Sequence, residues 1–498
     1  MLPAGFDNTL EKKAYQLLIG RLDGGHIGDA AYEEKIRGLV KKGMGGFILF
    51  GGEKESAGNF LSDLQSIADI PLFIASDVER GVGQQISGTT LFPCQMAVAA
   101  ALGRRSAEER LIIEQTVRAV AEESKDVGIN IPLIPVLDVN QNADNPIIST
   151  RAFSDDAETV AELGSHYIRV LEGEGLISCA KHFPGHGDTA SDSHITLPVI
   201  NKPRDALMDV DIMPFRRAVE AGVSSIMVGH LSVTAFNGEP ASLSREIVTH
   251  LLKEELDFRG LIMTDALNMN ALQGYANVPA RCINAGVDIL LHPVDPEVSA
   301  AEIMDAVRME DIKNGQIEAA VDRIIRQKER IARVSGPEVD YSAHDALATR
   351  ISEMAITLVK DTSGLLPFAG KKVSVVFCGD TTLFSSSPLR KVFEGRVVSA
   401  DEDRTSGITV FAVFTSVSAW KGSSGIDQEE KLRIQKHIKK SVHSIVISFG
   451  SPYVLRHFHD ADILIAAYEA TEQAQKAVIK CLRGEIEFNG RLPVKLDG

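Results

Sequence analysis

Titratable side chains are concentrated in one stretch of the chain, Lys181-His-Phe-Pro-Gly-His-Gly-Asp-Thr-Ala-Ser-Asp-Ser-His194. The stretch follows an apolar run at residues 176–180, which predicts a short buried strand. One proline and two glycines bend the backbone between the charged residues. Polar, irregular segments of this kind inside a compact domain are typical of functional loops. The sequence therefore predicts that this loop carries part of an active site.

Asp192 and His194 are the residues of this loop best suited to acid–base chemistry. In an extended segment, residues two apart face the same side, so the carboxylate can reach the imidazole. Such a carboxylate orients the ring and stabilises its protonated form, which makes the His a general acid near neutral pH. The alternative is a loop His that only satisfies a neighbouring Asp. The position beside Lys181 and His182 favours the chemical role, and His186 is interpreted as an ordered part of the bend.

Two aspartates directly follow apolar runs: Asp77 follows residues 71–76, and Asp265 follows residues 261–264. An Asp directly after a parallel strand of a barrel points into its mouth, where it can act as a nucleophile or general base. Asp77 can accept hydrogen bonds from two adjacent hydroxyls of a sugar. The alternatives are a helix N-cap for Asp265, and a cap or a salt bridge to Arg80 for Asp77.

Eight short apolar runs alternate with helical patterns through the first two thirds of the chain. This alternation predicts an N-terminal (β/α)₈ TIM-like barrel, and hence an α/β fold. A doubly wound open sheet is the competing fold, but the count of eight favours closure. The runs are residues 15–20, 46–50, 72–76, 131–137, 176–180, 225–229, 261–264 and 287–291.

Titratable residues follow six of these eight runs, at the carboxyl ends where such barrels carry their chemistry. Packing alone does not explain so much charge at one rim. Arg21 and Arg151 lie on further loops of the same rim, where a solvated surface position is the alternative for each. The residues that follow the runs are Asp77, Asp138, Lys181 with His182, His230, Asp265 and His292.

A second, smaller α/β domain is predicted after the barrel. Residues 301–335 have a helical pattern and are expected to close the barrel, and residues 333–340 are expected to lead out of it. The pattern at residues 342–361 predicts a helix. Further apolar runs follow, with a helical pattern at 427–440. The predicted division is 1–335 for the barrel, 336–364 for a linker and helix, and 365–498 for the C-terminal domain. These later runs are residues 373–378, 408–414, 444–449 and 463–467.

The composition excludes several classes of function. The chain has 498 residues, 44% of them hydrophobic, and a net charge of −16, which argues against a nucleic-acid or anionic-membrane role. Its five cysteines are dispersed, so we expect reduced core thiols and no disulfide framework. Without a signal-peptide pattern or a membrane-spanning run, the sequence predicts a cytoplasmic protein that binds neither membrane nor nucleic acid.

At these residues the chain resembles glycoside hydrolase family 3, and within it the β-N-acetylglucosaminidases of peptidoglycan recycling. The likeness is carried by Lys181-His-Phe-Pro-Gly-His-Gly-Asp-Thr189 with Asp192-Ser-His194, by Asn145-Pro with Arg151-Ala-Phe, and by Thr264-Asp265. It runs in the same order over roughly residues 10–300. The C-terminal part resembles the αβα sandwich domain of two-domain members. A glycoside is the small-molecule substrate that the resemblance implies, and no cofactor or metal is expected.

The resemblance implies a retaining, exo-acting mechanism with a covalent glycosyl-enzyme. It implies that Asp265 is the nucleophile and that His194, oriented by Asp192, is the acid/base. It also implies that the sugar is bound by Asp77, Arg151, Lys181 and His182, with Arg21 as a further candidate. The chain departs from the family at Arg80, because it reads Asp-Val-Glu-Arg-Gly where the acetylglucosaminidases resemble Asp-x-Glu-Gly-Gly.

Three alternatives to a hydrolase of this specificity remain open. In the first alternative, a neutral imidazole does not repel an incoming anion, so phosphate could replace water as the attacking group and the protein would be a phosphorylase. A β-glucosidase of the same family belongs to the same alternative. A zinc-dependent hydrolase could use rim residues as ligands. A sugar-binding protein without turnover is the third, although Asp265, Asp192 and His194 are all present. The zinc ligands would be His182, His186, His230 and His292 with Asp265.

Overall fold

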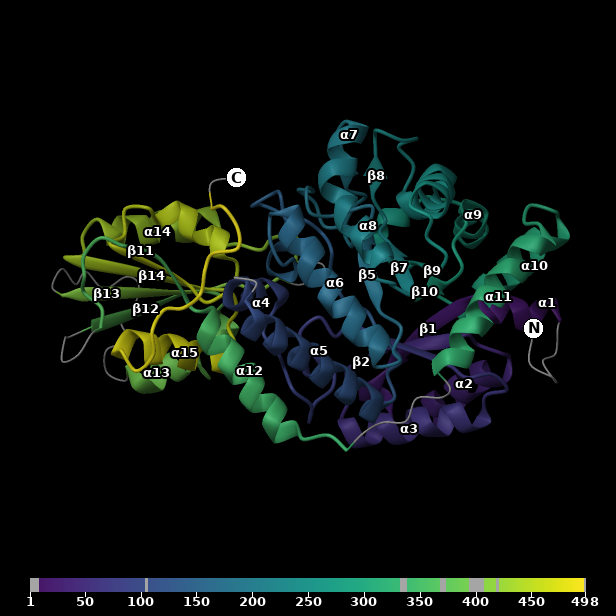
Figure 1. Cartoon of the computed structure of the whole chain (residues 1–498), viewed down its shortest axis with the longest axis horizontal. Coiled ribbons are helices and arrows are strands. Elements are labelled where there is room, and N and C mark those ends of the chain that lie inside the picture. Colours follow the sequence, from purple (N-terminus) through teal and green to yellow (C-terminus); the bar gives the residue numbers. More distant parts are fainter. Residues whose placement is uncertain are drawn as a thin grey trace.

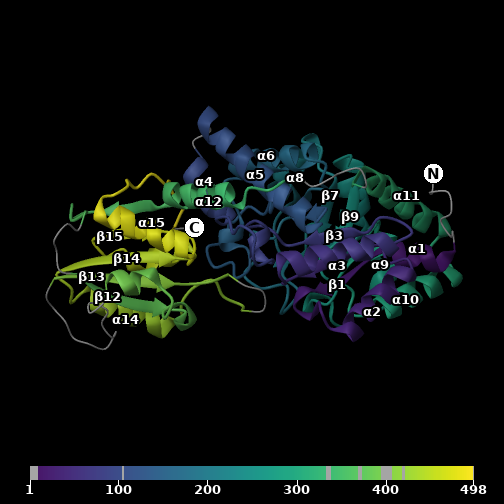
Figure 2. The same cartoon turned by 90° about the horizontal axis from the view of Figure 1, so that it is seen from below.

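The computed structural model of the chain describes residues 9–103, 106–331, 338–367, 373–393, 407–417 and 421–496. It is an α/β structure with two bodies side by side (Figure 1). The larger body contains the elements up to α11, and the smaller one contains β11 to β15 and their helices. Helices α12 and α4 pack together where the two bodies meet (Figures 1 and 2).

A curled arrangement of parallel strands forms the centre of the larger body. Five strands pair in the order β10-β1-β2-β3-β4 and three in the order β5-β7-β9, while β6 (Val199–Ile200) pairs with β8 (Ser232–Val233). Single parallel bridges, Val136–Lys181 and Met263–Ile289, join residues near the edges of the two larger sheets. The strands are β1 (Leu18–Asp23), β2 (Gly46–Phe50), β3 (Phe73–Ser76), β4 (Ile131–Pro132), β5 (Cys179–Phe183), β7 (Ser225–Val228), β9 (Leu261–Thr264) and β10 (Leu290–Leu291).

The helices of the larger body surround these strands (Figure 1). Helix α5 shows how the sequence specifies them: Ser106 and Glu109 form a capping box, and Gly128 ends the helix with a φ of 95°. Helix α5 spans Ala107–Val127. The others are α1 (Leu10–Gln16), α2 (Ala30–Lys41), α3 (Lys54–Ile67), α4 (Gln95–Leu102), α6 (Ala157–Gly173), α7 (Arg204–Ala206), α8 (Met213–Glu220), α9 (Val278–Ala285), α10 (Pro296–Arg308) and α11 (Asn314–Ile331), with π-helical segments at Leu207–Asp211 and Glu246–Glu255.

Two of the predicted strand positions are wrong. Tyr15 belongs to α1, which Thr9 caps, so the apolar run at 15–20 spans a helix end and the start of β1. The run at 176–180 overlaps β5 only in its last two residues, because β5 begins at Cys179 and continues through Lys181 and His182 to Phe183. A short apolar run does not distinguish a strand from the buried end of a helix, which explains the first error. The second arises because β5 continues into polar residues, which an apolar run does not include.

The smaller body is built on one mixed sheet in the order β11-β15-β14-β13-β12, with β11 antiparallel to β15 and the other pairs parallel. Helix α14 (Gln428–Ile438) lies on one face, and α13 (Pro388–Val392) and α15 (Glu472–Arg483) lie on the other (Figure 1). The strands are β11 (Thr357–Asp361), β12 (Val373–Gly379), β13 (Ile408–Phe414), β14 (His443–Phe449) and β15 (Ile463–Ala466).

The helix predicted at residues 342–361 is shorter than expected. Helix α12 spans Tyr341–Ala355, and residues 357–361 form the edge strand β11 instead. The segment Ile-Thr-Leu-Val at 356–359 is rich in β-branched residues, which favour a strand when a partner strand is available. The predicted domain boundary at 335, and most of the predicted exit at 333–340, lie outside the described residues.

Two further observations bear on the composition. The five cysteines are all buried and unpaired, as expected of reduced core thiols. None of the helices in the described ranges combines the length and the apolar composition that crossing a membrane requires.

Lys328 is buried in the larger body among neutral partners. Its Nζ donates to Gln16 Oε1 at 3.0 Å and to the Gly45 carbonyl at 2.7 Å, and it lies 4.9 Å from the centre of the Phe73 ring. Burial lowers the pKa of Lys328 to about 7. The folded protein therefore releases this proton far more readily than the unfolded chain does.

We expect Lys328→Met to change how stability depends on pH. Between pH 7 and about 10.4 the unfolded wild-type chain holds a proton here that the folded protein lacks, so wild-type stability rises with pH. The methionine variant lacks this rise. The free energy of unfolding of the wild type should therefore gain roughly 3 kcal/mol on that of the variant between pH 7 and 9.5. If the unfolding temperatures of the wild type and the variant changed in parallel across this pH range, the lowered pKa of Lys328 would be contradicted.

Candidate active site

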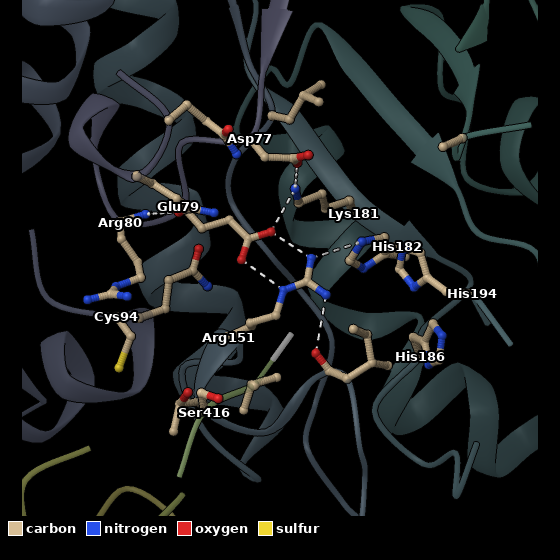
Figure 3. A pocket seen from close by; sticks show the side chains of 18 of the residues that line it. Asp77, Glu79, Arg80, Cys94, Arg151, Lys181, His182, His186, His194 and Ser416 are labelled. Carbon is tan, nitrogen blue, oxygen red and sulfur yellow. Dashed lines mark hydrogen bonds and ion pairs between the residues drawn. The ribbon is translucent and has the colours of Figure 1, made fainter. Parts of the chain in front are cut away.

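A cavity of about 800 Å³ lies at the carboxyl ends of the parallel strands, and both bodies of the molecule line it. Asp77 follows β3, Asp265 follows β9 and His292 follows β10, whereas Lys181 and His182 lie within β5. Every residue that the sequence singled out for substrate binding lines this cavity (Figure 3). His194 and Asp265 line it too, while Asp192 lies behind His194.

Two cations and two carboxylates form a compact cluster in the wall of the cavity (Figure 3). Lys181 Nζ contacts Asp77 Oδ1 at 2.7 Å and Glu79 Oε1 at 2.8 Å, although only 1% of the lysine side chain is exposed. Arg151 donates to both oxygens of Glu79, from Nε at 2.8 Å and from Nη2 at 2.6 Å. The surface alternative for Arg151 is therefore wrong, and so is the proposed salt bridge from Asp77 to Arg80.

Burial and the neighbouring charges shift the pKa values of this cluster in opposite directions, and the charges have the larger effect. Burial alone would raise the pKa of Glu79, but Arg151 and Lys181 hold it well below its usual range. Burial alone would lower the pKa values of Lys181 and Arg151, but the neighbouring carboxylates hold both above their usual range. Glu79, Lys181 and Arg151 therefore remain charged at neutral pH. Asp77, the more accessible of the two carboxylates, can accept hydrogen bonds from a ligand.

Glu79 is the member of the cluster that sequence reasoning missed. It lies two residues after Asp77, on the same loop, and carries no signal beyond that spacing. Its partners are distant in sequence, since 72 residues separate it from Arg151. Its position two residues after the rim aspartate was the one sequence feature that could have identified Glu79 as a member of the cluster.

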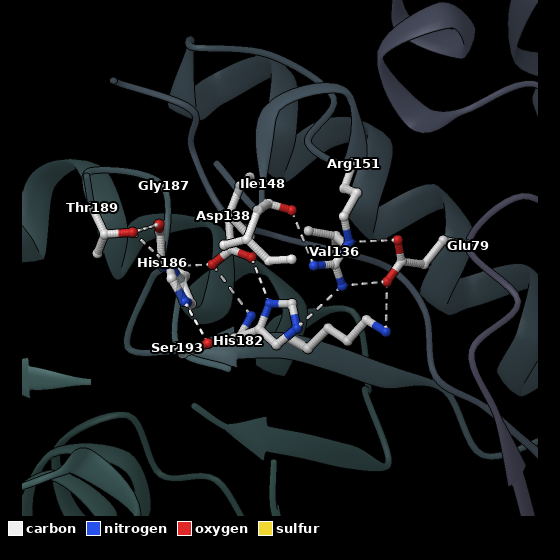
Figure 4. A network of polar contacts seen from close by, with 12 residues as sticks. Glu79, Val136, Asp138, Ile148, Arg151, His182, His186, Gly187, Thr189 and Ser193 are labelled. Carbon is white, nitrogen blue, oxygen red and sulfur yellow. Dashed lines mark hydrogen bonds and ion pairs between the residues drawn. The ribbon is translucent and has the colours of Figure 1, made fainter. Parts of the chain in front are cut away.

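His182 and His186 share a buried carboxylate, Asp138 (Figure 4). Asp138 Oδ2 lies 2.7 Å from His182 Nδ1, and Oδ1 accepts from the His186 backbone N–H at 2.6 Å. Burial raises the pKa of Asp138, but the charge and hydrogen bond of His182 outweigh it, and the net shift is downward. Because Nδ1 of His182 faces this carboxylate, its Nε2 is directed toward Arg151 Nη2, at 3.5 Å.

His186 is an ordered part of the bend, as expected. Its Nδ1 lies 2.8 Å from Thr189 Oγ1 and its Nε2 lies 3.1 Å from Ser193 Oγ. Burial lowers the pKa of His186 to about 4, so the ring is neutral at neutral pH. Both ring nitrogens are engaged within the loop.

Asp192 and His194 are in contact, but by a different local geometry from the one predicted. Residues 193–195 form a turn and not an extended segment. Asp192 Oδ1 accepts the His194 backbone N–H and contacts His194 Nδ1, each at 2.8 Å. An aspartate readily bonds the backbone two residues on, and this local bond competes with extended structure. The Asp192 side chain is fully buried, whereas 23% of the His194 side chain is exposed.

Asp265 caps no helix, so the alternative role considered for it is wrong. The chain turns after β9 and next forms the 3-10 helix Asn270–Leu272. Oδ1 of Asp265 accepts the Ala266 N–H at 2.7 Å. Burial raises the pKa of Asp265, but the nearby imidazoles of His182, His230 and His194 lower it by more, to about 2. Asp265 is therefore an ionised carboxylate at neutral pH.

The remaining rim residues are placed as follows. Arg21 lines the cavity with half of its side chain exposed, pairs with Asp23 at 3.0 Å and lies over the Phe50 ring. His230 is buried between Ser242 Oγ and the Ala266 carbonyl. Burial lowers the pKa of His292 to about 4. In the described part of the chain no group of three or more His, Cys, Asp or Glu side chains is arranged to hold a metal ion, so the zinc alternative lacks a ligand set there.

Comparison with protein-family models gives a match over residues 9–327 to the glycosyl hydrolase family 3 N-terminal domain. The chain is 31% identical over 365 residues to β-hexosaminidase A of Pseudoalteromonas piscicida, covering 65% of this chain and 60% of that protein. It is 26% identical over 519 residues to a β-N-acetylglucosaminidase/β-glucosidase of Cellulomonas fimi, covering 92% of this chain and 90% of the relative.

A solved structure agrees with these matches over nearly the whole chain. The structure of a glycoside hydrolase family 3 β-N-acetylglucosaminidase from Paenibacillus sp. str. FPU-7 is 27% identical to this chain and superposes with a TM-score of 0.84. The similarity covers 98% of this chain and 99% of that one, so it includes both bodies.

Proposed function

Because the chain belongs to glycosyl hydrolase family 3, we propose that it hydrolyses terminal β-linked N-acetylglucosamine by a retaining, two-step mechanism. The observation that carries the proposal is the shared cavity. An ionised carboxylate, Asp265, and an imidazole backed by a carboxylate, His194, line the same space as the charged cluster around Lys181. Nucleophile, acid and sugar-binding groups are thereby available to one ligand.

In the first step, Asp265 attacks the anomeric carbon and forms a covalent ester with the sugar. The bond to the leaving oxygen breaks as a proton passes to that oxygen from His194. Because Nδ1 of His194 faces Asp192, Nε2 is the nitrogen that holds the transferable proton. In the second step, the neutral imidazole takes a proton from water, which attacks the same carbon and releases Asp265.

The sugar hydroxyls are bound by the charged cluster in this proposal. Asp77 accepts hydrogen bonds from hydroxyls, and Lys181 and Arg151 donate them. Because Nδ1 of His182 faces Asp138, Nε2 is the ring nitrogen of His182 that is available to a hydroxyl. Fixed charges of both signs in a buried wall suit a polyhydroxylated ligand, because each hydroxyl can donate and accept. Arg21, at the edge of the cavity, is available to a group that extends past the sugar.

The same family relationship supports a finer description of the fold. We infer that the two larger parallel sheets form one closed (β/α)₈ barrel, residues 1–335, because the bridges Val136–Lys181 and Met263–Ile289 lie where they would join. We also infer that the predicted domain 365–498, extended at its start to include β11, forms an αβα sandwich, since helices lie on both faces of its sheet. Of the predicted linker and helix, residues 336–364, helix α12 (Tyr341–Ala355) lies between them, whereas residues 357–361 belong to the sheet of the smaller body as β11.

Aryl β-N-acetylglucosaminide and aryl β-glucoside, compared under the same conditions, test the proposed activity. We expect release of N-acetylglucosamine with a higher kcat/KM than release of glucose, and retention at the anomeric carbon by NMR of the first product. Absence of turnover on both substrates, despite ligand binding, would favour a sugar-binding protein instead.

The activity of His194→Ala should depend on the leaving group in a way that shows whether His194 acts as the acid. An aryl leaving group with a low pKa departs without a proton, whereas a sugar leaving group needs one. We expect kcat for a sugar leaving group to fall by about 10²–10⁴-fold and kcat for the activated aryl group to fall far less. Equal losses on both substrates would assign His194 a structural role.

A second candidate activity, phosphorolysis, is favoured by the use of an imidazole in place of a carboxylate. After it has donated its proton, His194 is neutral and does not repel phosphate, so phosphate can attack the glycosyl-enzyme in place of water. Saturating phosphate should then yield the sugar 1-phosphate. If phosphate leaves rate and product unchanged, hydrolysis is the sole activity.

A further inference from the structure

A second cavity, of about 410 Å³, lies at the opposite end of β9 from Asp265. Leu261, the first residue of β9, lines this cavity, whereas Asp265 follows the last residue of the strand. Its other walls come from the π-helical segment Glu246–Glu255, from helix α11 and from the loop that leads into β9. Among the described residues, the two cavities share no lining residue, so the second one is separate from the active site.

The lining of this second cavity is strongly basic, although the net charge of the chain is −16. Four of the eight described residues that line it are Lys or Arg, and none is Asp or Glu. Two of the cations, Arg323 and Arg326, lie on one face of α11, because residues three apart on a helix are neighbours. A concave surface that carries one sign of charge attracts ligands of the opposite sign. The four cations are Lys253, Arg259, Arg323 and Arg326.

Asp288, beside the cavity, balances part of this charge. Its side chain is fully buried, and Oδ1 accepts from Arg323 Nε at 3.0 Å and from Nη2 at 2.6 Å. Lys253 Nζ lies 3.9 Å from the same oxygen, which is too far for a hydrogen bond. Burial lowers the pKa of Lys253 by more than Asp288 raises it, and the charges of Arg323 and Arg245 lower it further. Lys253 therefore lacks a full counter-charge within the protein.

The other two cations are closer to solvent. Arg259 pairs with Asp257, and 75% of the arginine side chain and 73% of the aspartate side chain are exposed. Arg326 is exposed as well, and no ion pair involves it in the described ranges of the chain. Four cations therefore face two carboxylates, which leaves an excess of two positive charges at the cavity. A dianion would balance this excess.

Gln327 adds a group that suits a hydroxyl. It lies four residues after Arg323, on the same face of α11, and lines the same cavity. Its amide oxygen, Oε1, is buried and has no hydrogen-bond partner within the described part of the chain. A buried acceptor without a partner costs free energy, which a donor group on a ligand would recover. A ligand that carries a hydroxyl as well as a double negative charge therefore fits this cavity best.

We propose that the second cavity binds a phosphate monoester that carries hydroxyls, such as the phosphate of a small polyol or sugar. A phosphate monoester is close to a dianion at neutral pH and matches the excess charge. Lys253 and Arg326 donate to the phosphate oxygens, and the Gln327 amide binds a hydroxyl. A volume of about 410 Å³ is within the range of small-molecule sites. The site does not depend on the proposed glycosidase activity.

Calorimetric titration with three probes tests the site at a pH of about 7.5, above the second pKa of a phosphate monoester. The probes are methyl phosphate, glycerol 3-phosphate and acetate. We expect both phosphate esters to bind, and acetate, a monoanion, to bind at least about tenfold more weakly. Arg326→Ala should weaken both esters at least about tenfold, because a hydrogen bond to a charged group is lost. This variant should fold normally, since alanine is the best helix former.

Two further variants locate the parts of the ligand. Gln327→Leu keeps the approximate size of the side chain but removes the amide. It should weaken glycerol 3-phosphate about fivefold relative to methyl phosphate, because only the former brings hydroxyls. Arg21→Ala is the matched control, since it removes a half-exposed arginine from the lining of the active-site cavity. It should leave the affinities for both esters unchanged.

The site is overturned if neither ester binds to the wild type, or if Arg326→Ala binds both esters as tightly as the wild type does. A loss in Arg21→Ala alone would place the anion in the active-site cavity and would overturn the site as well. Equal affinities for acetate and the esters would refute the match to a dianion, and equal losses of both esters in Gln327→Leu would refute the hydroxyl contact. None of these titrations requires turnover, so a failure of the proposed glycosidase activity would be seen separately.

Discussion

Replacement of Asp265 by alanine is expected to abolish turnover, lowering kcat on an aryl β-N-acetylglucosaminide by at least about four orders of magnitude. Without the carboxylate no covalent intermediate can form, and a retaining enzyme has no other route. An activated leaving group should not rescue the variant, because the attack on the anomeric carbon is itself lost. Steady-state rates at enzyme concentrations high enough to detect residual activity give the measurement.

The protein should stay folded in this variant. Within the contacts described, the Asp265 side chain accepts one hydrogen bond, from the Ala266 N–H, so little structure depends on it. Asp265→Asn preserves the size of the side chain and should be equally inactive. Asp188→Ala removes a carboxylate that pairs with Lys202 at 2.9 Å, away from the cavity lining, and should retain activity. Residual turnover above a hundredth of wild type in either Asp265 variant would refute the nucleophile assignment.

The position of the site could be read from the sequence because polar residues interrupt apolar runs at the ends of parallel strands. Asp77, Lys181, His182 and Asp265 each stand where an apolar run stops. Parallel strands bring their carboxyl ends to one edge, so order along the chain was sufficient to predict that these side chains meet. No pairing information was needed for that step.

Local geometry was harder to predict, because competing hydrogen bonds decide it. The contact between Asp192 and His194 was expected from an extended backbone, yet the aspartate instead accepts the backbone N–H two residues on and forms a turn. Likewise, residues 357–361 pair with β15, about a hundred positions away, and so form a strand where helical periodicity was expected. Long-range partners are not visible in a single sequence.

Glu79 is the clearest case of such a partner, and its replacement should have the second-largest effect. Among the described residues it is the one carboxylate in contact with both Lys181 and Arg151. Glu79→Gln keeps the size of the side chain but leaves Arg151 without its bidentate partner. Breaking a buried ion pair by removing one partner costs about 3–5 kcal/mol of stability. We expect a loss of this size in the free energy of unfolding.

The activity of Glu79→Gln should fall as well as its stability, because Glu79 sets the positions of the two cations that would hold the sugar. Displacing a positioned group by about 1 Å can cost about a hundredfold in rate, and we expect kcat/KM to fall by about that factor in Glu79→Gln. Glu172→Gln is the matched control: that glutamate pairs with Arg330 outside the cavity lining, so the variant should lose stability but keep kcat/KM. If both variants lose activity in proportion to stability, Glu79 supports the fold alone. If only Glu79→Gln loses activity, the carboxylate that the sequence did not reveal is part of the sugar-binding site.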